Sequence, residues 1–488
     1  MAAERAHWGS RLGFVLAAAG SAVGLGNIWR FPGQVEENGG GLFVLTYILC
    51  IAVIGLPVLM AEVFLGRTSQ NSPVGAFRHH SGRKSPWMGI GWLCVATAFV
   101  ILSFYSVVAG WCMHYAWISV TTTFQGMSPE EIEAVQVGLV TSPGLSTMWH
   151  LIFIGLTVSI VIAGIKEGIE LWVKILMPLL VVLLLILLIY GIAEGEFAQG
   201  MAFMFTPNFE TFSWGTVLSA VGQGLFTLSV GMGALITYGS YLRKDDDLTG
   251  TTLSVGGVDT VMALLAGMVI FPILFLAALD PQDGTTLVFV TLPNAFADMP
   301  GGMLLAPAFF ILLTFAALTS SISLLEVATA YFIDERGWSR TKAALGTGGL
   351  IAILGIPSAV AGGSVLFGDG MSNLVGMNWL GFFNYLQGDW MLPLGALGIA
   401  LFVGWRVPNN VREAGFKAGS SFLWLYPGWV IILRFVIPIG LTTILLLNAI
   451  ELISAGDDLI DDEVEAAEMV DEAGDIEAPG NGVNAQRP

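Results

Sequence analysis

The sequence predicts an all-α integral membrane protein that crosses the bilayer with 11 transmembrane helices. Apolar residues make up 55% of the 488 residues and charged residues only 11%, and the mean hydropathy is +0.77. Soluble domains of this length do not have such a composition. Eleven apolar runs are long enough to cross a membrane. Of the 19 Lys and Arg residues, all except Arg30, Arg434 and Arg487 fall on one side of the alternating connections.

The predicted spans set the topology. Positive charge collects in cytoplasmic loops, so we expect a cytoplasmic N-terminus, and an odd number of spans then places the C-terminus outside. Residues 1–455 would form the membrane domain, and the acidic segment 456–488 has too few large apolar residues to fold, so we expect it to be disordered. The spans cover about residues 12–33, 41–66, 87–123, 147–165, 168–193, 214–242, 252–279, 303–334, 342–362, 379–404 and 422–452.

The net charge of −18 excludes nucleic-acid binding, which requires a basic face. Acidic loop residues such as Asp280, Asp283 and Asp298 favour an adaptation to high salt over a single acidic tail on an ordinary membrane protein. The three cysteines and five histidines show no metal-ligand spacing and no nucleophile partner, so we expect no enzymatic activity. In one outer loop, residues 128–131 read Ser-Pro-Glu-Glu and predict the start of a short surface helix.

The first span contains a predicted break. Residues 20–32 read Gly-Ser-Ala-Val-Gly-Leu-Gly-Asn-Ile-Trp-Arg-Phe-Pro, and three glycines followed by a proline weaken helix closure. A broken helix is tolerated at bilayer depth where the freed backbone lines a cavity. Freed carbonyls can hold a cation there, and freed N–H groups can hold a carboxylate. The alternative is tight helix packing through Gly20 and Gly24, which leaves the polar residues downstream unexplained.

The sixth span repeats this pattern. Residues 225–233 read Leu-Phe-Thr-Leu-Ser-Val-Gly-Met-Gly, with two glycines and two hydroxyls in the middle of the membrane. Glycine-interrupted segments at corresponding positions of two halves indicate an inverted repeat and point to a binding site. We therefore expect a 5+5 inverted repeat, about residues 5–195 and 205–404, with broken first and sixth helices. The pairing rests on position alone, and the last span is an addition.

Three segments form a long signature: 7–14 (His-Trp-Gly-Ser-Arg-Leu-Gly-Phe), 20–32 and 37–41 (Glu-Asn-Gly-Gly-Gly). Together they resemble the neurotransmitter:sodium symporter family, and in particular its prokaryotic amino-acid transporters. The resemblance covers roughly residues 5–450. It implies a sodium-coupled symporter of the cell membrane that imports an amino acid by alternating access, with two Na⁺ ions co-transported and no obligate protein partner evident.

The resemblance implies two sites for Na⁺, which prefers oxygen ligands. One site matches the carbonyls of Gly20, Val23 and Ala316 and the hydroxyls of Thr319 and Ser320. From the residues alone, these hydroxyls could equally bond back to carbonyls of their own helix. The family match favours the ion site.

The other sodium site matches the Ala22 carbonyl, Asn27, Thr227 and Asp259. Many relatives have asparagine where this chain has Asp259. A buried acid in an apolar span is a functional candidate, the alternative being a structural acid paired with a polar neighbour. Chloride-binding relatives use a serine four residues further on, at the position of Ala263. A fixed carboxylate would supply the charge that chloride supplies elsewhere, so we expect chloride independence.

The resemblance also implies the substrate site. The substrate carboxylate would meet the N–H groups of Leu25 and Gly26 and the hydroxyl of Tyr105. Monoamine carriers have aspartate at the position of Gly24, so a glycine there favours a substrate with its own α-carboxylate. The pocket is apolar with two hydroxyls, which predicts a hydrophobic or aromatic amino acid, although without the resemblance these residues would be taken for plain core. The implied residues are Ser21, Ala22, Leu25, Gly26, Ile101, Tyr105, Phe226, Thr227, Ser229, Met232, Ser320 and Leu324.

The family's gates imply further residues. Outside, Arg30 would pair with an acid of the tenth span, but the best match is Asn384. This departure means that either a neutral hydrogen bond closes the outer gate or Asp389 serves instead. The implied inner gate consists of Arg5, Trp8, Tyr241 and Asp334.

Two more features follow the family pattern. Glu62 in the second span is expected to support the broken first span. Gly168 and Pro178 are separated by nine residues, a spacing that would let the fifth span unwind, since proline removes a backbone donor.

Other function classes remain as alternatives. An amino-acid-binding sensor would need a cytoplasmic output domain, and no inner loop is long enough for one. A channel would show a repeated pore segment or rings of charge, and neither is evident. The residues do not fix which amino acid is carried.

Overall fold

The computed structural model describes residues 7–122, 124–277, 284–450 and 452, and in these residues it contains helices and no strand. Arg5, Asp280, Asp283 and the segment 456–488, on which some predictions fall, lie outside the described residues. The chain divides into two compact units, residues 1–441 and 442–488. In the second unit, residues 442–450 are helical.

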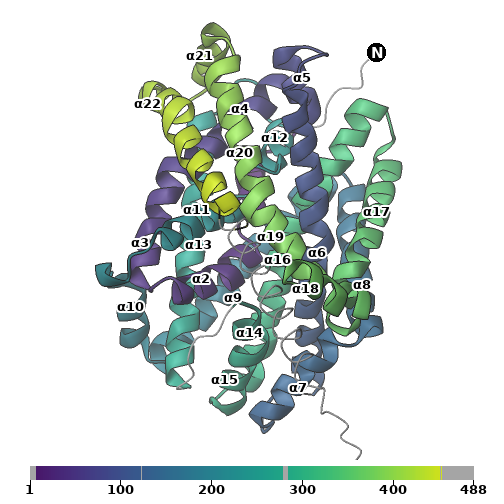
Figure 1. Cartoon of the computed structure of the whole chain (residues 1–488), viewed down its shortest axis with the longest axis vertical. Helices are drawn as coiled ribbons and strands as arrows, with labels where there is room; N and C mark the ends of the chain where they lie inside the picture. The colour runs from purple at the N-terminus through teal and green to yellow at the C-terminus, as the bar shows by residue number, and fades with distance from the viewer. Residues whose placement is uncertain (1–6, 123, 278–283, 451, 453–488) are drawn as a thin grey trace, which may run out of the picture. The chain divides into compact units, whose positions relative to one another are not determined.

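The helices of the first unit are labelled in chain order in Figure 1. They are α1 (Arg11–Ala22), α2 (Phe31–Glu37), α3 (Gly41–Cys50), α4 (Leu56–Ser69), α5 (Pro73–Ser81), α6 (Met88–Thr121), α7 (Pro129–Val140), α8 (Pro143–Ile162), α9 (Leu171–Ala193), α10 (Phe197–Phe205), α11 (Trp214–Thr227), α12 (Ala234–Gly239), α13 (Leu248–Leu276), α14 (Gly284–Thr286), α15 (Leu292–Asp298), α16 (Gly302–Arg336), α17 (Arg340–Val360), α18 (Gly370–Val375), α19 (Trp379–Tyr385), α20 (Leu392–Leu401), α21 (Asn409–Lys417) and α22 (Tyr426–Ile431). Short π-helical turns join several of them, among them η1 (Gly26–Arg30) and η3 (Ile165–Glu170).

The expected membrane-spanning helices are present. Among the described residues, nine unbroken helices are long and apolar enough to cross a bilayer, and a tenth crossing is the pair Arg11–Ala22 and Gly26–Glu37, bent by 47°. The sixth expected span consists of α11 and α12, which six non-helical residues separate. The all-α membrane class is therefore confirmed, while the exact count of 11 spans stays a prediction.

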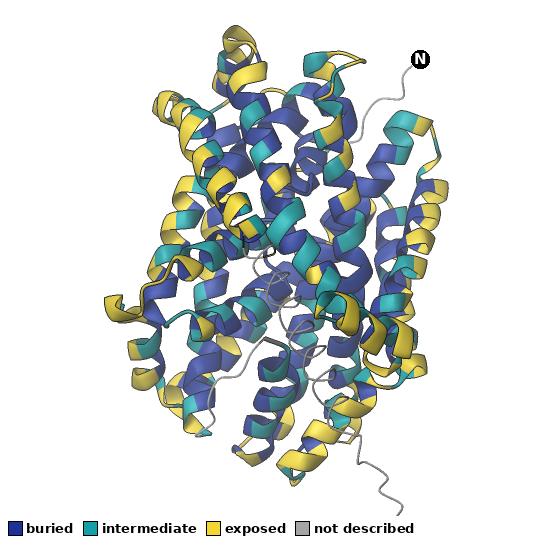
Figure 2. Cartoon of the chain, viewed as in Figure 1, coloured by how far each residue is buried: buried dark blue, intermediate teal, exposed yellow. Residues whose placement is uncertain are grey.

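Two long helices form the centre of the unit. For both α6 and α16, 78% of the most apolar stretch is buried, against 33% for Ile165–Ala193. They pack against each other, and α8 and α17 pack on them from one side (Figures 1 and 2). The short helices α1 and α12 pack against α16, and α11 packs against α3 and α20. The residues of both breaks are buried, so the breaks lie inside the protein and away from lipid.

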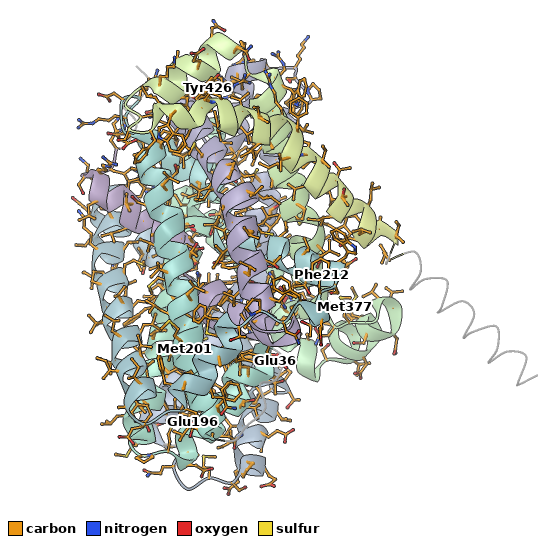
Figure 3. All side chains as sticks on the ribbon, turned by 90° about the vertical axis from the view of Figure 1, so that its left-hand side faces the viewer. Glu36, Glu196, Met201, Phe212, Met377 and Tyr426 are labelled. Atoms are coloured by element: carbon orange, nitrogen blue, oxygen red, sulfur yellow. The ribbon has the colours of Figure 1, made fainter. Side chains whose placement is uncertain are left out.

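The connections separate to two ends of the unit. In Figure 1, α5 and α21 lie at the upper end of the view, and α7 and α15 lie at the lower end. Figure 3 shows the same separation from the side, with Tyr426 near one end and Glu196 near the other. The helix expected after Ser128 is confirmed as α7, because the Ser128 side chain accepts from Glu131 N and the Glu131 side chain accepts from Ser128 N.

Candidate functional site

The first break leaves backbone groups without their usual helical partners. The α1 helix ends at Ala22, and Val23 adopts an extended conformation. In an unbroken helix, Leu25 N–H would donate to the Ser21 carbonyl. Here Leu25 N–H instead donates to the Tyr105 hydroxyl at 3.3 Å. The freed Ser21 carbonyl is therefore available to side chains of other helices.

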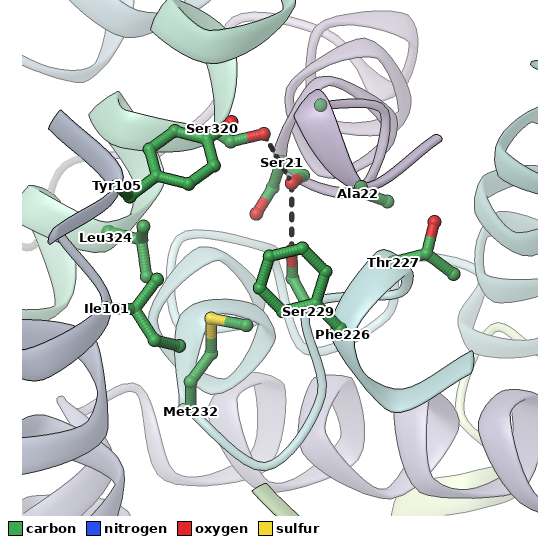
Figure 4. Close-up of a pocket in the computed structure, with 12 residues that line it drawn as sticks. Ser21, Ala22, Ile101, Tyr105, Phe226, Thr227, Ser229, Met232, Ser320 and Leu324 are labelled. Atoms are coloured by element: carbon green, nitrogen blue, oxygen red, sulfur yellow. Dashed lines mark hydrogen bonds between the residues drawn. The ribbon is translucent and has the colours of Figure 1, made fainter. Parts of the chain in front are cut away.

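Two hydroxyls from distant parts of the chain meet that carbonyl. Ser229 Oγ donates to Ser21 O at 2.8 Å, and Ser320 Oγ donates to the same oxygen at 3.0 Å (Figure 4). Ser229 belongs to the second break and Ser320 to α16. The Ser21 carbonyl thus joins both breaks and the central helix at one point.

The second break is held by different means. Between α11 and α12, Ser229, Gly231 and Gly233 all have positive φ, at 54°, 88° and 75°. The buried carboxylate of Glu62 accepts from Gly231 N at 2.6 Å and from Ile236 N at 3.3 Å. The expectation that Glu62 supports the first span was therefore wrong, because the packing of α4 on α12 directs the carboxylate to the sixth span.

A cavity lies between the two breaks, α6 and α16 (Figure 4). Its empty space, part of it open to solvent, is about 310 Å³, but the centre of a water-sized sphere can occupy only about 20 Å³, so the cavity is nearly closed. Eleven of the twelve residues expected to bind substrate line this cavity. The exception is Leu25, and Gly24, which was not in the expected set, lines the cavity as well. The lining residues are Ser21, Ala22, Gly24, Gly26, Ile101, Tyr105, Phe226, Thr227, Ser229, Met232, Ser320 and Leu324.

Asp259 lies next to this cavity in a fully buried position. Its Oδ1 accepts from Asn27 Nδ2 at 2.8 Å and from Thr227 Oγ1 at 3.0 Å. Its Oδ2 is buried and has no partner at hydrogen-bond distance, although the Tyr47 hydroxyl, itself without a partner at that distance, interacts with the same carboxylate. A buried carboxylate oxygen without a donor at hydrogen-bond distance, beside an unwound backbone, suits a hard cation. The residues expected for one sodium site, apart from the Ala22 carbonyl, are thus joined by hydrogen bonds.

Three of the five residues expected for the other sodium site, Val23, Ala316 and Thr319, also meet. Thr319 Oγ1 donates to Ala316 O at 2.9 Å and lies 3.5 Å from Val23 O, so it reaches from α16 to the first break. Ser320 turns away from its own helix toward the first break. At Gly20, an added Cβ would lie 3.3 Å from Met177 and Val173 of α9. The Thr319 hydroxyl therefore bonds to a carbonyl of its own helix and also contacts the first break, so the two alternatives for this hydroxyl are both present.

A second, wider cavity lies on the α2 side of the site. Arg30 lines it together with Asn384, and its guanidinium lies over the Phe226 ring at 5.0 Å. Asp389 also interacts with Arg30 electrostatically, whereas Asn384 accepts from Gln387 Nε2 at 3.4 Å. Both candidates for the outer gate therefore lie near Arg30, and Glu37 lines the same cavity and also interacts with Arg30 electrostatically.

At the other end, Trp8 packs against the last turn of α12 and the residues that follow it. Its indole N–H donates to Tyr238 O at 3.0 Å, and its backbone N–H donates to Tyr241 O at 3.2 Å. Its ring meets the Tyr238 ring edge-on at 5.3 Å. Asp334, expected in the same gate, accepts from Ser72 N at 2.7 Å. The expected gate residues that the structure describes thus gather at this end.

A buried network at this end was missed in the sequence. Tyr241 donates to Glu326 Oε1 at 2.6 Å, and Arg340 donates to both carboxylate oxygens of Glu326, at 3.1 and 2.5 Å. Glu326 is fully buried in α16. The signal was available, because an acid inside an apolar span requires a partner.

Comparisons with known proteins agree with this arrangement. A family model described as "Sodium:neurotransmitter symporter family" matches residues 5–130 and 130–453. An uncharacterized sodium-dependent transporter of Bacillus subtilis is 34% identical over 92% of this chain and 98% of its own length. Another of Methanocaldococcus jannaschii is 32% identical over 93% of this chain and 92% of its own length. The crystal structure of MhsT in complex with L-phenylalanine is 43% identical, covers 91% of this chain and 99% of that chain, and gives a TM-score of 0.83.

Proposed function

The chain belongs to the sodium:neurotransmitter symporter family, and from this premise we propose that it imports a hydrophobic or aromatic amino acid together with Na⁺. It is a multi-pass membrane protein and a sodium-dependent transporter, and its relatives are transporters and not enzymes. The observation that carries the proposal is the cavity between the two breaks, which has unwound backbone on one side and apolar side chains on the other.

The lining of the cavity supports an amino-acid substrate. Gly26 N–H and the Tyr105 hydroxyl are donors for a carboxylate, near the start of the second half of the broken span. Ile101, Met232 and Leu324 supply the apolar part. Ser229 and Ser320 already donate to the Ser21 carbonyl, so an apolar side chain would leave neither hydroxyl unsatisfied. The crystal structure of MhsT is a complex with L-phenylalanine, which is consistent with this substrate class.

Two co-transported Na⁺ ions complete the proposal. One would sit among the Ala22 carbonyl, Asn27, Thr227 and Asp259, and the other among the Gly20, Val23 and Ala316 carbonyls and the hydroxyls of Thr319 and Ser320. A fixed carboxylate at Asp259 balances one positive charge inside the site. Transport would therefore not require chloride.

Alternating access would use the two ends of the cavity. Arg30, with Asp389 or Asn384, closes the outer end, and Trp8 and Tyr241 close the inner end, with the N-terminus in the cytoplasm. Gly168 lies in the π-helical turn η3 and Pro178 inside α9, so this stretch departs from regular α-helical bonding at both positions. Its local unwinding would give water a path to the second ion.

The test is uptake of labelled phenylalanine, tryptophan and leucine into proteoliposomes, with an inward gradient of sodium chloride, sodium gluconate or potassium chloride. We expect concentrative uptake with both sodium salts and none with potassium. Uptake that requires chloride would overturn the role of Asp259. Sodium-dependent binding without concentrative uptake would identify a sensor instead, and no response to any of the three would refute the substrate class.

A further inference from the structure

Polar contacts hold the first half of the broken span at both ends: Ser21 bonds to Ser229, Ser320 and Ser323 near its end, and three further attachments lie near its beginning. The break separates α1 from α2, so α1 can move without carrying the rest of its own span. The first attachment is the hydrogen bond from the Trp8 indole to Tyr238 O at the end of α12. The second consists of the hydrogen bonds that Gly9 N and Ser10 Oγ donate to the Glu170 carboxylate, at 2.7 and 3.2 Å. The third is an ion pair of 2.8 Å between Arg11 Nη2 and Asp247 Oδ2.

The two partners of this ion pair have unequal surroundings. Asp247 caps α13 by accepting from Gly250 N at 3.0 Å, and it also accepts from Ser421 N at 3.0 Å and from Ser421 Oγ at 2.5 Å. Its side chain is 6% exposed, whereas that of Arg11 is 56% exposed. Asp247 is therefore fixed to α13 and to Ser421. Arg11 reaches it from the first turn of α1.

This asymmetry makes the contact reversible. If Arg11 withdraws, its guanidinium enters water, and Asp247 keeps the donors of Gly250 and Ser421. Burial opposes ionisation of Asp247, but the hydrogen bonds from Ser421 and Gly250 and the charge of Arg11 together hold the pKa of this carboxyl below its ordinary value. The carboxylate thus stays charged, and the contact can form again at neutral pH.

A second ion pair at the same end, between Arg340 and Glu326, is much more deeply buried. Arg340 binds the fully buried Glu326 through both carboxylate oxygens. Separating that pair would leave a buried charge without a partner, which is strongly unfavourable. The network around Glu326 is therefore permanent structure, and of these two ion pairs the contact between Arg11 and Asp247 is the one that can open.

We propose that the pair Arg11–Asp247 is an inner latch that holds α1 against the start of α13 while the inner side is closed. It separates when α1 swings outward to open the inner side, and Arg11 acts as a positioning residue. The direction of release rests on the proposed function, but the latch itself requires only that α1 has two positions.

The latch can be tested without any substrate. All three native cysteines are replaced by alanine, and Ser240, which is buried at the end of α12, is replaced by cysteine as a reporter. The rate at which a hydrophilic maleimide modifies this cysteine in detergent micelles then measures how often the inner side opens. The variants are R11Q, which removes the charge, and R11K, which keeps it. The matched control is R78Q, which removes the ion pair between Arg78 and Glu335 at the same end without touching α1.

Half-exposed ion pairs are weak, so we expect R11Q to raise the modification rate about three- to fivefold. R11K and R78Q should react at the parental rate, and all variants should show similar thermal unfolding. An unchanged rate in R11Q, or an equal rise in R78Q, would overturn the latch. If uptake fails for every amino acid but R11Q still responds, the proposed substrate is wrong and the latch stands.

Discussion

The two helix breaks beside the cavity differ in the side chains that satisfy their free backbone groups. At the first break, the freed Leu25 N–H and Ser21 carbonyl are met only by hydroxyls, those of Tyr105, Ser229 and Ser320. At the second break, a buried carboxylate, Glu62, accepts two backbone N–H groups directly. Hydroxyls can rotate to accept or donate, whereas a buried carboxylate bound to N–H groups is fixed.

We infer from this difference that the first break binds the ligand and that the second break supports the site. At the first break, the hydroxyl partners of Leu25 N–H and the Ser21 carbonyl are exchangeable, so these two groups can turn to a ligand with little loss, whereas Gly24 N–H and the Gly26 carbonyl are bound by Asn27 and Gln223. The second break has its bonds filled by protein, so it serves as a rigid wall. Variants on either side should therefore have different consequences, the largest at the fixed break.

The largest effect is expected for E62A. It leaves the N–H groups of Gly231 and Ile236 buried without an acceptor, which should reduce the free energy of unfolding by about 3 kcal/mol or more. Thermal unfolding in detergent measures the loss. The matched control is E413A, since Glu413 is exposed and pairs with Lys417 one turn further along its own helix. Equal melting of the two variants would show that the second break does not depend on Glu62.

The next effect is expected for D259N, at the carboxylate that joins Asn27 and Thr227. A neutral amide keeps the shape but loses the charge that attracts a cation, so the half-saturating sodium concentration should rise about 10- to 100-fold. Sodium titration of substrate binding measures this. If D259N also becomes dependent on chloride, the carboxylate has taken the place of that anion. An unchanged sodium response would mean that Asp259 is structural.

A smaller effect is expected for Y105F at the exchangeable break. It removes the oxygen that receives Leu25 N–H and that would meet the substrate carboxylate. The loss of one hydrogen bond to a charged group should weaken substrate affinity about tenfold, with little change in melting. Competition binding measures it, and Y115F, at another buried tyrosine of α6, controls for general packing. A large drop in melting without loss of affinity would contradict the division between the breaks.

The smallest effect compares S229G with S229A. Ser229 has φ of 54°, a conformation that costs a non-glycine residue about 1 kcal/mol. Both variants lose the bond to the Ser21 carbonyl, also about 1 kcal/mol, but only glycine relieves the backbone. We expect S229G to melt near the parent and S229A below it. The reverse order would show that the hydroxyl contact matters more than the backbone.

The local patterns of the sequence determined much of the molecule. Apolar runs gave the helices, because lipid leaves no other partner for the backbone, and the glycines of segments 20–26 and 231–233 marked the two breaks. The capping pattern at Ser128 predicted α7. The residues around the cavity were identified only because the resemblance assigned them, since apolar residues of this kind look like ordinary core.

Only the tertiary structure decided which polar groups meet. Glu62 and Gly231 are 169 positions apart, and Arg11 and Asp247 are 236 apart, so no local pattern could pair them. Hydropathy is a property of short segments, whereas the partner of a buried charge depends on how whole helices pack. For that reason the sequence located the breaks, and the fold determined that Glu62 fixes the second one and that Arg11 holds the first half of the broken span.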